Sequence, residues 1–168
     1  MTTTPQPLKQ KITLPRTTMF EDSIIQYAKL CNIPNFKGVA MRDEILQKRP
    51  LLKNECGVLN LNKHTQKGSH WTCWMKKGSD RYYFDSFGER PPNELIEYLK
   101  TEKEMKGDSP VIKCNAVTVQ HYLSNECGSL CLYVMYHMMR GDDTFTSVIK
   151  KLQKRYEKPT STILRVDN

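Results

Sequence analysis

Long apolar runs are absent from this sequence of 168 residues. No stretch approaches the roughly 20 apolar residues that a helix needs to cross a bilayer. The first ten residues are rich in Thr, Pro and Gln and lack the apolar core of a secretory signal. Internal repeats and low-complexity segments are missing too. These absences predict an intracellular protein without a membrane span, formed of one domain large enough to bury its own core.

A complete set of metal ligands is also lacking. Cys127 and Cys131 lie one helical turn apart and could form half of a zinc site, but no second Cys/His pair stands at ligand spacing. We therefore expect no metal. The long chain has no secretion signal, so we expect a reducing compartment where most thiols are buried and one carries chemistry. The six cysteines are Cys31, Cys56, Cys73, Cys114, Cys127 and Cys131.

Acidic residues are too few to balance the basic ones, which leaves a formal net charge of +8 and a pI of about 9.2. Such an excess of positive charge attracts polyanions. No nucleic-acid-binding motif or aromatic platform accompanies it. Two interpretations stay open: a solvated basic surface, or accessory contact with DNA. The residues that would make this contact are Lys150, Lys151, Lys154 and Arg155.

The chain divides into a loose arm over residues 1–16, a single domain over residues 17–158 and a flexible tail over residues 159–168. Apolar periodicity and breaker residues predict its elements. Helices are expected over Phe20–Cys31, Met41–Lys48, the segment from Pro91 to Leu99, Cys127–Arg140 and Thr144–Tyr156. Strands are expected over Gly57–Leu61, Ser69–Lys76, Arg81–Ser86 and Val111–Val119. A Gly-containing turn between the second and third strands predicts a hairpin.

The helix that begins at Cys127 is apolar on nearly every side, which predicts that it is central and buried. A cysteine at its start meets unpaired N–H groups and the positive end of the helix dipole, and both favour a thiolate. The same amides can stabilise an oxyanion on an attacked carbonyl. Gly128 lets another backbone approach closely. The alternative interpretation is a cysteine that is merely packed in the core.

A thiolate nucleophile needs a base, and His70 at the start of a strand is the candidate, with Trp71 beside it to exclude water. Asp85 ends the partner strand among aromatic residues, so that it is expected to be buried and to need a partner. If the two strands pair antiparallel, the imidazole and the carboxylate meet at one end of the hairpin. The alternatives are a surface histidine and an aspartate that caps a turn.

Gln120 lies seven residues before Cys127, in the loop that leads into the helix. Its side-chain amide is a neutral donor that can join the Cys127 N–H in an oxyanion hole. The alternative is a solvated loop residue. The four residues His70, Asp85, Gln120 and Cys127 together indicate acyl transfer by a cysteine protease.

The order His-Trp, an acid, Gln and Cys-Gly resembles the adenovirus-type cysteine proteases (adenain), above all those of Maverick/Polinton elements and related DNA viruses. The related SUMO-deconjugating proteases share it. The resemblance runs from about Phe20 to Tyr156. Its other motifs are Asn35-Phe36-Lys37-Gly38-Val39 with Met41-Arg42-Asp43, Glu55-Cys56-Gly57-Val58-Leu59-Asn60-Leu61, and Pro91-Pro92-Asn93-Glu94-Leu95. The acid is Asp here, where mastadenovirus enzymes have Glu.

This resemblance implies an α+β fold with a mixed central sheet and the cysteine helix packed on it. It implies cleavage of viral structural (capsid) precursors at Gly-containing sites, in a virion or host nucleus. The residue roles it implies are those above, with Trp71 walling the site and Gly128 supporting the oxyanion hole. The chemistry would need no cofactor, although DNA and a viral peptide would stimulate it. We expect a monomer.

Two rival functions stay open. One is removal of ubiquitin-like modifiers, which also uses a narrow, water-excluding slot. The other is a non-catalytic, basic protein that binds DNA or capsid on the same fold.

Overall fold

The computed structural model describes residues 9–63, 70–101, 103–104, 107, 110–141, 143–158 and 160–166. Within this part of the chain no helix has the length and apolar character required to span a membrane. The elements in chain order are β1 (Gln10–Thr13), α1 (Glu21–Leu30), β2 (Phe36–Met41), the 3₁₀ helix η1 (Arg42–Lys48), β3 (Asn54–Asn60), β4 (Trp71–Lys77), β5 (Asp80–Phe84), α2 (Asn93–Tyr98), β6 (Lys113–Cys114), α3 (Cys127–Met139), α4 (Phe145–Glu157) and β7 (Ile163–Val166).

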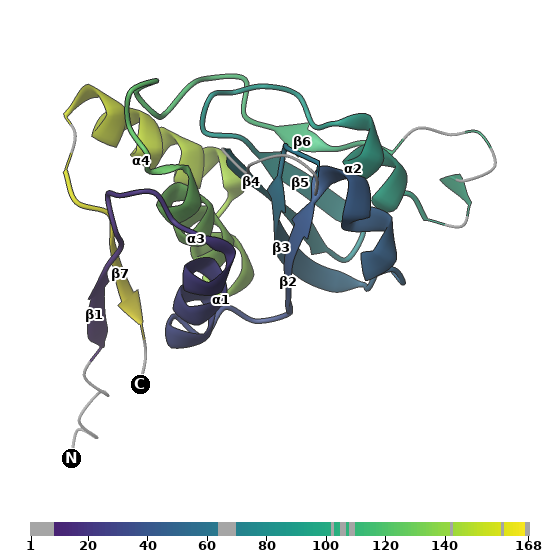
Figure 1. Cartoon of the computed structure of the whole chain (residues 1–168), viewed down its shortest axis with the longest axis horizontal. Coiled ribbons are helices and arrows are strands. Elements are labelled where there is room, and N and C mark those ends of the chain that lie inside the picture. The colour runs from purple at the N-terminus through teal and green to yellow at the C-terminus, as the bar shows by residue number, and fades with distance from the viewer. Residues whose placement is uncertain are drawn as a thin grey trace, which may run out of the picture.

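Five strands form the main sheet, in the order β2-β3-β4-β5-β6. The outer pairs, β2 with β3 and β5 with β6, are parallel, and the inner pairs are antiparallel. In Figure 1 the sheet occupies one half of the molecule and α1, α3 and α4 the other. This mixed sheet with helices beside it confirms the predicted α+β class.

The expected hairpin is present as β4 and β5. The two strands pair antiparallel from Lys77 opposite Asp80 to Cys73 opposite Phe84. Gly78 in the turn has a φ of 63°, a left-handed conformation that glycine adopts without strain. The open end of the hairpin therefore holds the residues just before β4 and just after β5.

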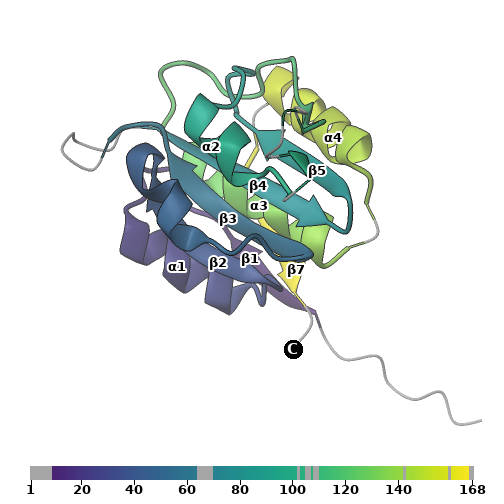
Figure 2. The same ribbon diagram turned by 90° about the vertical axis from the view of Figure 1, so that its right-hand side faces the viewer.

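Side chains alternate between the two faces of the sheet, so that each face has its own core. On one face Cys73, Met75 and Phe84 pack with the helices α1, α3 and α4. On the other face Trp74 and Tyr83 pack with η1 and α2. Figure 2 shows α2 and η1 on the near side of the sheet and α3 behind it. The helix α3 is thus enclosed between the sheet and the outer helices, as predicted.

Both chain ends differ from the loose arm and flexible tail that the sequence predicted. β1 pairs antiparallel with β7 in a separate two-stranded sheet. Ile12 of β1 and Leu164 and Val166 of β7 are buried there in the main core. The predicted arm and tail also include residues 1–8, 159, 167 and 168, which lie outside the described residues.

The predicted strand over Val111–Val119 is mostly wrong. Only Lys113–Cys114 forms a strand, while Val111 is 78% exposed. The side chain of Asn115 accepts a hydrogen bond from the Asp85 N–H (3.1 Å) and donates one to the Asp85 carbonyl (2.6 Å). A side-chain amide thus takes the place of the next pair of strand residues. The strand β2 was not predicted at all.

Candidate active site

The helix α3 begins at Cys127, and the residues after it explain how another segment can lie against its first turn. A Cβ on Gly128 would stand 3.2 Å from Met19 and 3.4 Å from the Trp71 ring, so glycine lets both side chains pack closely against this turn. The Trp71 indole N–H donates to the Met19 carbonyl at 2.8 Å. The Ser129 hydroxyl donates to the Pro15 carbonyl. The sequence Cys-Gly-Ser is therefore fitted to the chain segment that precedes α1.

His70 and Asp85 meet at the open end of the β4–β5 hairpin. His70 directly precedes β4 and Asp85 directly follows β5, so antiparallel pairing brings them to the same end. The Nε2 atom of His70 lies 2.8 Å from Oδ1 of Asp85. The structure therefore brings these two predicted residues into hydrogen-bonding contact.

The Asp85 carboxylate is fully buried. Its Oδ1 atom also accepts the Phe87 N–H at 2.8 Å, which closes the turn after β5. Asn115 holds the Asp85 backbone from the other side. The other carboxylate oxygen of Asp85, Oδ2, has no hydrogen-bond partner among the described residues. Asp85 thus makes the turn that the alternative interpretation proposed and also contacts His70.

The imidazole of His70 is hydrogen-bonded to Asp85 through Nε2, and it lines the same cavity as Cys127. Burial alone would lower its pKa, but the hydrogen bond to Asp85 and the electrostatic influence of Asp85 and Cys127 raise the pKa to about 9. The ring of Phe87 stacks on it with centroids 4.8 Å apart. At neutral pH the ring is therefore held as an imidazolium.

The amide of Gln120 is oriented by two neighbours. Its Oε1 atom accepts the Ser86 hydroxyl at 2.5 Å, and its Nε2 atom donates to the Ser124 carbonyl at 2.8 Å. A side-chain amide has two N–H groups, so that one stays for a ligand. Gln120 is buried and lines the same cavity as Cys127.

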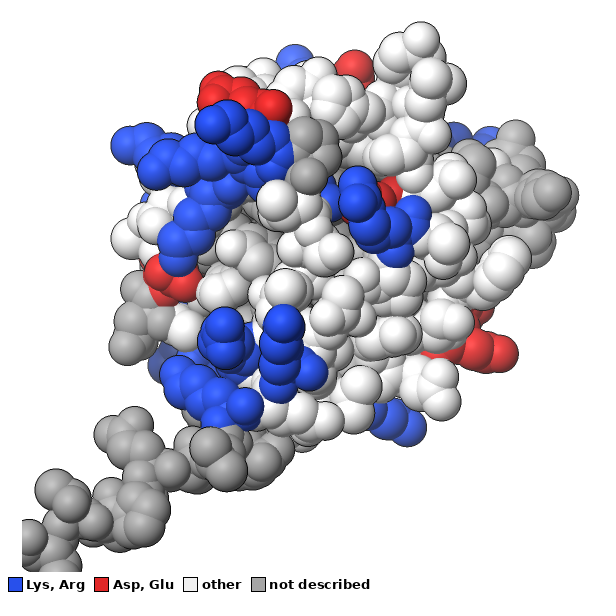
Figure 3. All heavy atoms as spheres, turned by 90° about the vertical axis from the view of Figure 1, so that its left-hand side faces the viewer, with Lys and Arg blue, Asp and Glu red and all other residues white. Residues whose placement is uncertain are grey.

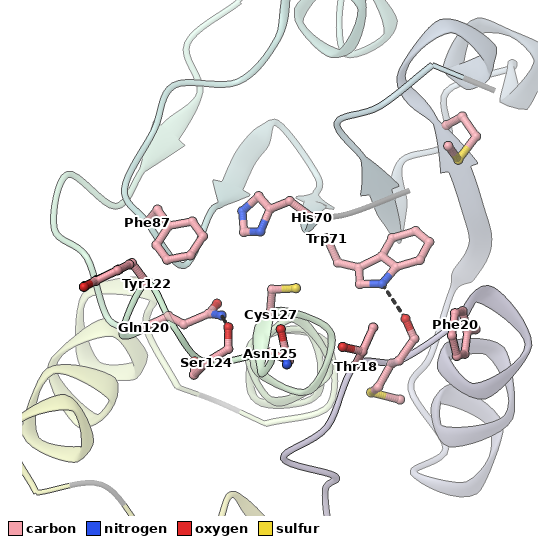
Figure 4. Close-up of a pocket in the computed structure, with 12 residues that line it drawn as sticks. Thr18, Phe20, His70, Trp71, Phe87, Gln120, Tyr122, Ser124, Asn125 and Cys127 are labelled. Carbon is pink, nitrogen blue, oxygen red and sulfur yellow. Dashed lines mark hydrogen bonds between the residues drawn. The ribbon is translucent and has the colours of Figure 1, made fainter. Parts of the chain in front are cut away.

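A cavity of about 530 Å³ opens over Cys127. Figure 4 shows its two sides: His70, Phe87 and Tyr122 to the left of the thiol, Trp71, Thr18 and Phe20 to the right. Two of the lining side chains are apolar and largely solvent-exposed, Phe20 at 72% and Tyr122 at 83%. The volume lies in the range of small-ligand sites. Three of the four predicted site residues, His70, Gln120 and Cys127, line this cavity. The fourth, Asp85, is buried behind His70.

Glu126, directly before the thiol, was missed by the sequence analysis. It is 6% exposed, and its Oε1 atom accepts Arg16 Nε at 3.2 Å and Arg155 Nη2 at 2.5 Å. These ion pairs tie the segment before α1 and the helix α4 to the start of α3. A long-range pair of this kind has no local sequence signal. Ser86 and Phe87, which hold Gln120 and His70, lie at or next to the end of the predicted strand Arg81–Ser86. Asn115, which holds Asp85, falls inside the predicted strand Val111–Val119, where nothing marked it.

The predicted DNA contacts do not form one group. Lys150, Lys151 and Lys154 are exposed on α4. Lys151 Nζ lies 3.5 Å from Asp143. The Arg155 side chain is only 11% exposed because it pairs with Glu126. Arg155 is therefore part of the support of α3, and its prediction as a surface contact is corrected.

Metal ligands do not gather at this site in the part of the chain that the structure describes. No group of three or more His, Cys, Asp or Glu side chains lies close enough there to hold an ion. Cys131, one turn after Cys127, is fully buried, and its thiol donates to the Trp71 carbonyl at 3.5 Å.

No protein-family model matches the sequence, and no curated protein is significantly similar to it. Among solved structures, the pS273R protease of ASFV aligns with a TM-score of 0.52 and 18% identity, over 87% of this chain and 69% of that chain. A second structure of that protease aligns with a TM-score of 0.44 and 21% identity, over 64% of this chain and 44% of that one. The Ulp1 protease domain in complex with Smt3, the yeast ortholog of SUMO, aligns at 0.47 with 15% identity, over 83% and 75%.

This chain spans only part of the neighbour's length, 69% in the first of these alignments and 44% in the second. At this level of identity the likeness concerns the arrangement of the backbone. This chain has the fold of the pS273R protease of ASFV.

Proposed function

We propose that this protein is a cysteine endopeptidase. One observation carries the proposal: His70 Nε2 lies 2.8 Å from Asp85 Oδ1, and His70 lines the same cavity as Cys127 at the start of α3. A nucleophile, a base and a residue that orients the base are the parts of a catalytic triad. They stand beside a cavity that is open to a ligand.

In the proposed mechanism the Cys127 thiolate attacks a peptide carbonyl, and the oxyanion accepts hydrogen bonds from the Cys127 N–H and the Gln120 amide. The His70 imidazolium gives its proton to the nitrogen of the leaving amine, and the C–N bond breaks. Water then attacks the thioester, loses a proton to His70, and releases the acid and the thiolate. Asp85 keeps the ring in one orientation throughout.

The substrates we propose are capsid or other structural precursor proteins, cut at Gly-containing sites in a virion or host nucleus. The resemblance to adenovirus-type proteases suggests this class. The packing around the thiol agrees with it: Trp71 is 8% exposed and lies against Gly128, which leaves little room for a large side chain next to the bond that is cut.

Stimulation by DNA and by a viral peptide is a further part of the proposal. Figure 3 shows groups of Lys and Arg side chains on the face that carries α4 and the β1–β7 sheet. Of the four predicted contacts, Lys150 and Lys154 remain as exposed cations on α4 without an ion pair in the described part of the chain. Loss of DNA retention at low salt in the Lys150→Gln, Lys154→Gln double variant would support the contact, and unchanged retention would refute it.

The deciding experiment combines labelling with cleavage. Iodoacetamide at neutral pH should label Cys127 before the other five cysteines, as read by peptide mass spectrometry. A denatured-protein peptide library should be cut by the wild type and left intact by Cys127→Ala, while Cys131→Ala, one turn along the same helix, retains activity. Turnover of a modifier-linked probe alone would point to the deconjugating rival. Equal labelling of buried cysteines and no cleavage would leave a non-catalytic protein.

A further inference from the structure

A second cavity lies at the far end of the sheet from Cys127. It has a volume of about 550 Å³, and its lining comes from the loop after η1, the end of β4 and the segment after α2. The strand β4 begins next to His70 and ends at Lys77. With a rise of about 3.3 Å per residue, the Lys76 end of this strand is roughly 17 Å from its Trp71 end. The two cavities are therefore separate sites.

The lining of this second cavity is rich in positive charge. Its eight residues include four cations, and none of the eight is an acid. They are Arg49, Pro50, Leu51, Leu52, Lys53, Lys76, Lys100 and Thr101. Cations that converge on a hollow repel one another, so such an arrangement is unfavourable unless an anion binds there.

Lys76 is the residue that makes this hollow more than a basic surface. It is only 7% exposed, yet it lines the cavity. Its Nζ atom donates to two backbone carbonyls, Gly78 at 2.7 Å and Lys53 at 3.3 Å. No described carboxylate lies within ion-pair distance of it. An ammonium has three N–H groups, so a third donor stays for a ligand.

The pKa of Lys76 is lowered, first by burial and then by the nearby charge of Arg81. The acids in this region do not remove the excess, because each already has a cation of its own. Glu55 pairs with Lys37 at 3.1 Å, and Glu104 pairs with Arg81.

The third acid near the cavity, Glu97, is also occupied. It lies 2.8 Å from Lys100, one of the four lining cations. Arg49 donates to the Glu97 carbonyl rather than to its carboxylate. Arg49, Lys53 and Lys76 are thus left without a carboxylate partner among the described residues.

We propose that this cavity binds a compact oligophosphate, an anion with two or more linked phosphate groups. A single carboxylate could neutralise only one of the cations, whereas a phosphate chain presents several charged oxygens to all of them. The volume fits a small molecule rather than a length of duplex nucleic acid. The cavity also has an apolar side, where Leu52 is 47% exposed and could cover the organic part of a nucleotide.

Isothermal titration calorimetry with sodium tripolyphosphate tests the proposal on the full chain at fixed ionic strength. The wild type should bind one equivalent. Lys76→Met keeps the apolar stem, removes the charge and should weaken binding at least tenfold. Lys29→Met makes the same change in net charge at an exposed position of α1 and should weaken binding less than twofold. Thermal melting of each variant, with and without the anion, reports whether it is folded.

Equal weakening by Lys76→Met and Lys29→Met would overturn the proposal, since it would mean unspecific attraction to a basic protein. Absence of wild-type binding would overturn it as well. If Lys76→Met fails to fold, Arg49→Met replaces it, with at least a threefold loss expected. ATP and tripolyphosphate titrated in parallel distinguish a nucleotide from a free phosphate chain, and binding of either supports the site. These outcomes are independent of any peptidase activity.

Discussion

The protein contains two His–Asp pairs of almost the same length that behave in opposite ways. His70 Nε2 lies 2.8 Å from Asp85, and His137 Nδ1 lies 2.9 Å from Asp143. Burial lowers the pKa of both rings. The pKa of His70 is nevertheless raised to about 9, whereas the pKa of His137 stays lowered.

The difference lies in what else faces each ring. The Asp85 side chain is 1% exposed, and the nearby Cys127 raises the pKa of His70 further. Asp143 is 30% exposed and is shared with Lys151, whose charge lowers the pKa of His137. A carboxylate at hydrogen-bonding distance therefore does not by itself raise the pKa of a histidine. The pKa of His70 is raised because its acid is enclosed and Cys127 is nearby.

The largest test of this comparison replaces each histidine in turn. His70→Gln should lower the rate of peptide cleavage by at least about 10⁴-fold, because the base and the proton donor are both lost. His137→Gln makes the same change on α3, away from the cavity, and should leave the rate within about threefold. Steady-state cleavage and thermal melting of both variants give the answer. A similar loss in both would mean that either change acts through the fold.

The carboxylates give the next largest effect. Asp85→Asn should lower kcat by roughly 10²–10⁴-fold, since the ring loses its charged partner but Cys127 remains. Asp143→Asn should leave kcat unchanged and only alter the titration of His137. If Asp85→Asn retained full activity, Asp85 would be no more than a turn residue held by Phe87 and Asn115.

Local patterns predicted the hairpin and α3, because both are set by neighbours in the chain. In the two strands around Gly78 and in the apolar run after Cys127, the residues that the local pattern marks as buried are buried in the structure. The ends of the chain could not be predicted in this way. The strands β1 and β7 are four residues each and stable only as partners of one another, across most of the chain length.

The meeting of His70 and Asp85 was predictable because one hairpin carries both. What surrounds them was not, since it depends on contacts between remote segments. Asn115 replaces a strand where alternation predicted one, and Glu126 joins Arg16 and Arg155 from opposite ends of the chain. Arg155 was predicted as a surface contact for DNA because a sequence shows that a residue is charged but not which residue it pairs with. Its partner in the structure is Glu126.

A third carboxylate, Glu126, extends the comparison, since it is buried like Asp85 but contacts arginines instead of histidine. Glu126→Gln should lower kcat roughly three- to tenfold with KM within twofold, because looser ion pairs let the start of α3 shift. Glu94→Gln on α2, whose partner is Arg42 at 3.5 Å, is the matched control and should have no effect. A change in KM alone would assign Glu126 to substrate binding.

Added salt should lower wild-type kcat modestly, because Arg16, which pairs with Glu126, is 55% exposed.

The smallest effect is on the pH dependence of stability, and it has opposite signs for the two pairs. Because the folded pKa of His70 is raised, its contribution is full below about pH 6.5 and is lost as the pH rises through about 9. The folded pKa of His137 is lowered, so its contribution to stability is present above about pH 6.5 and is lost as the pH falls below that value.

Urea unfolding of wild type, His70→Gln and His137→Gln between pH 5 and pH 10 measures both contributions to the free energy of unfolding. Titration of the two rings by NMR assigns each contribution to its histidine. The stability advantage of wild type over His70→Gln should shrink toward alkaline pH, and its advantage over His137→Gln should shrink toward acid pH. Parallel curves for the two variants would mean that Cys127 and the enclosed Asp85 do not set His70 apart from His137.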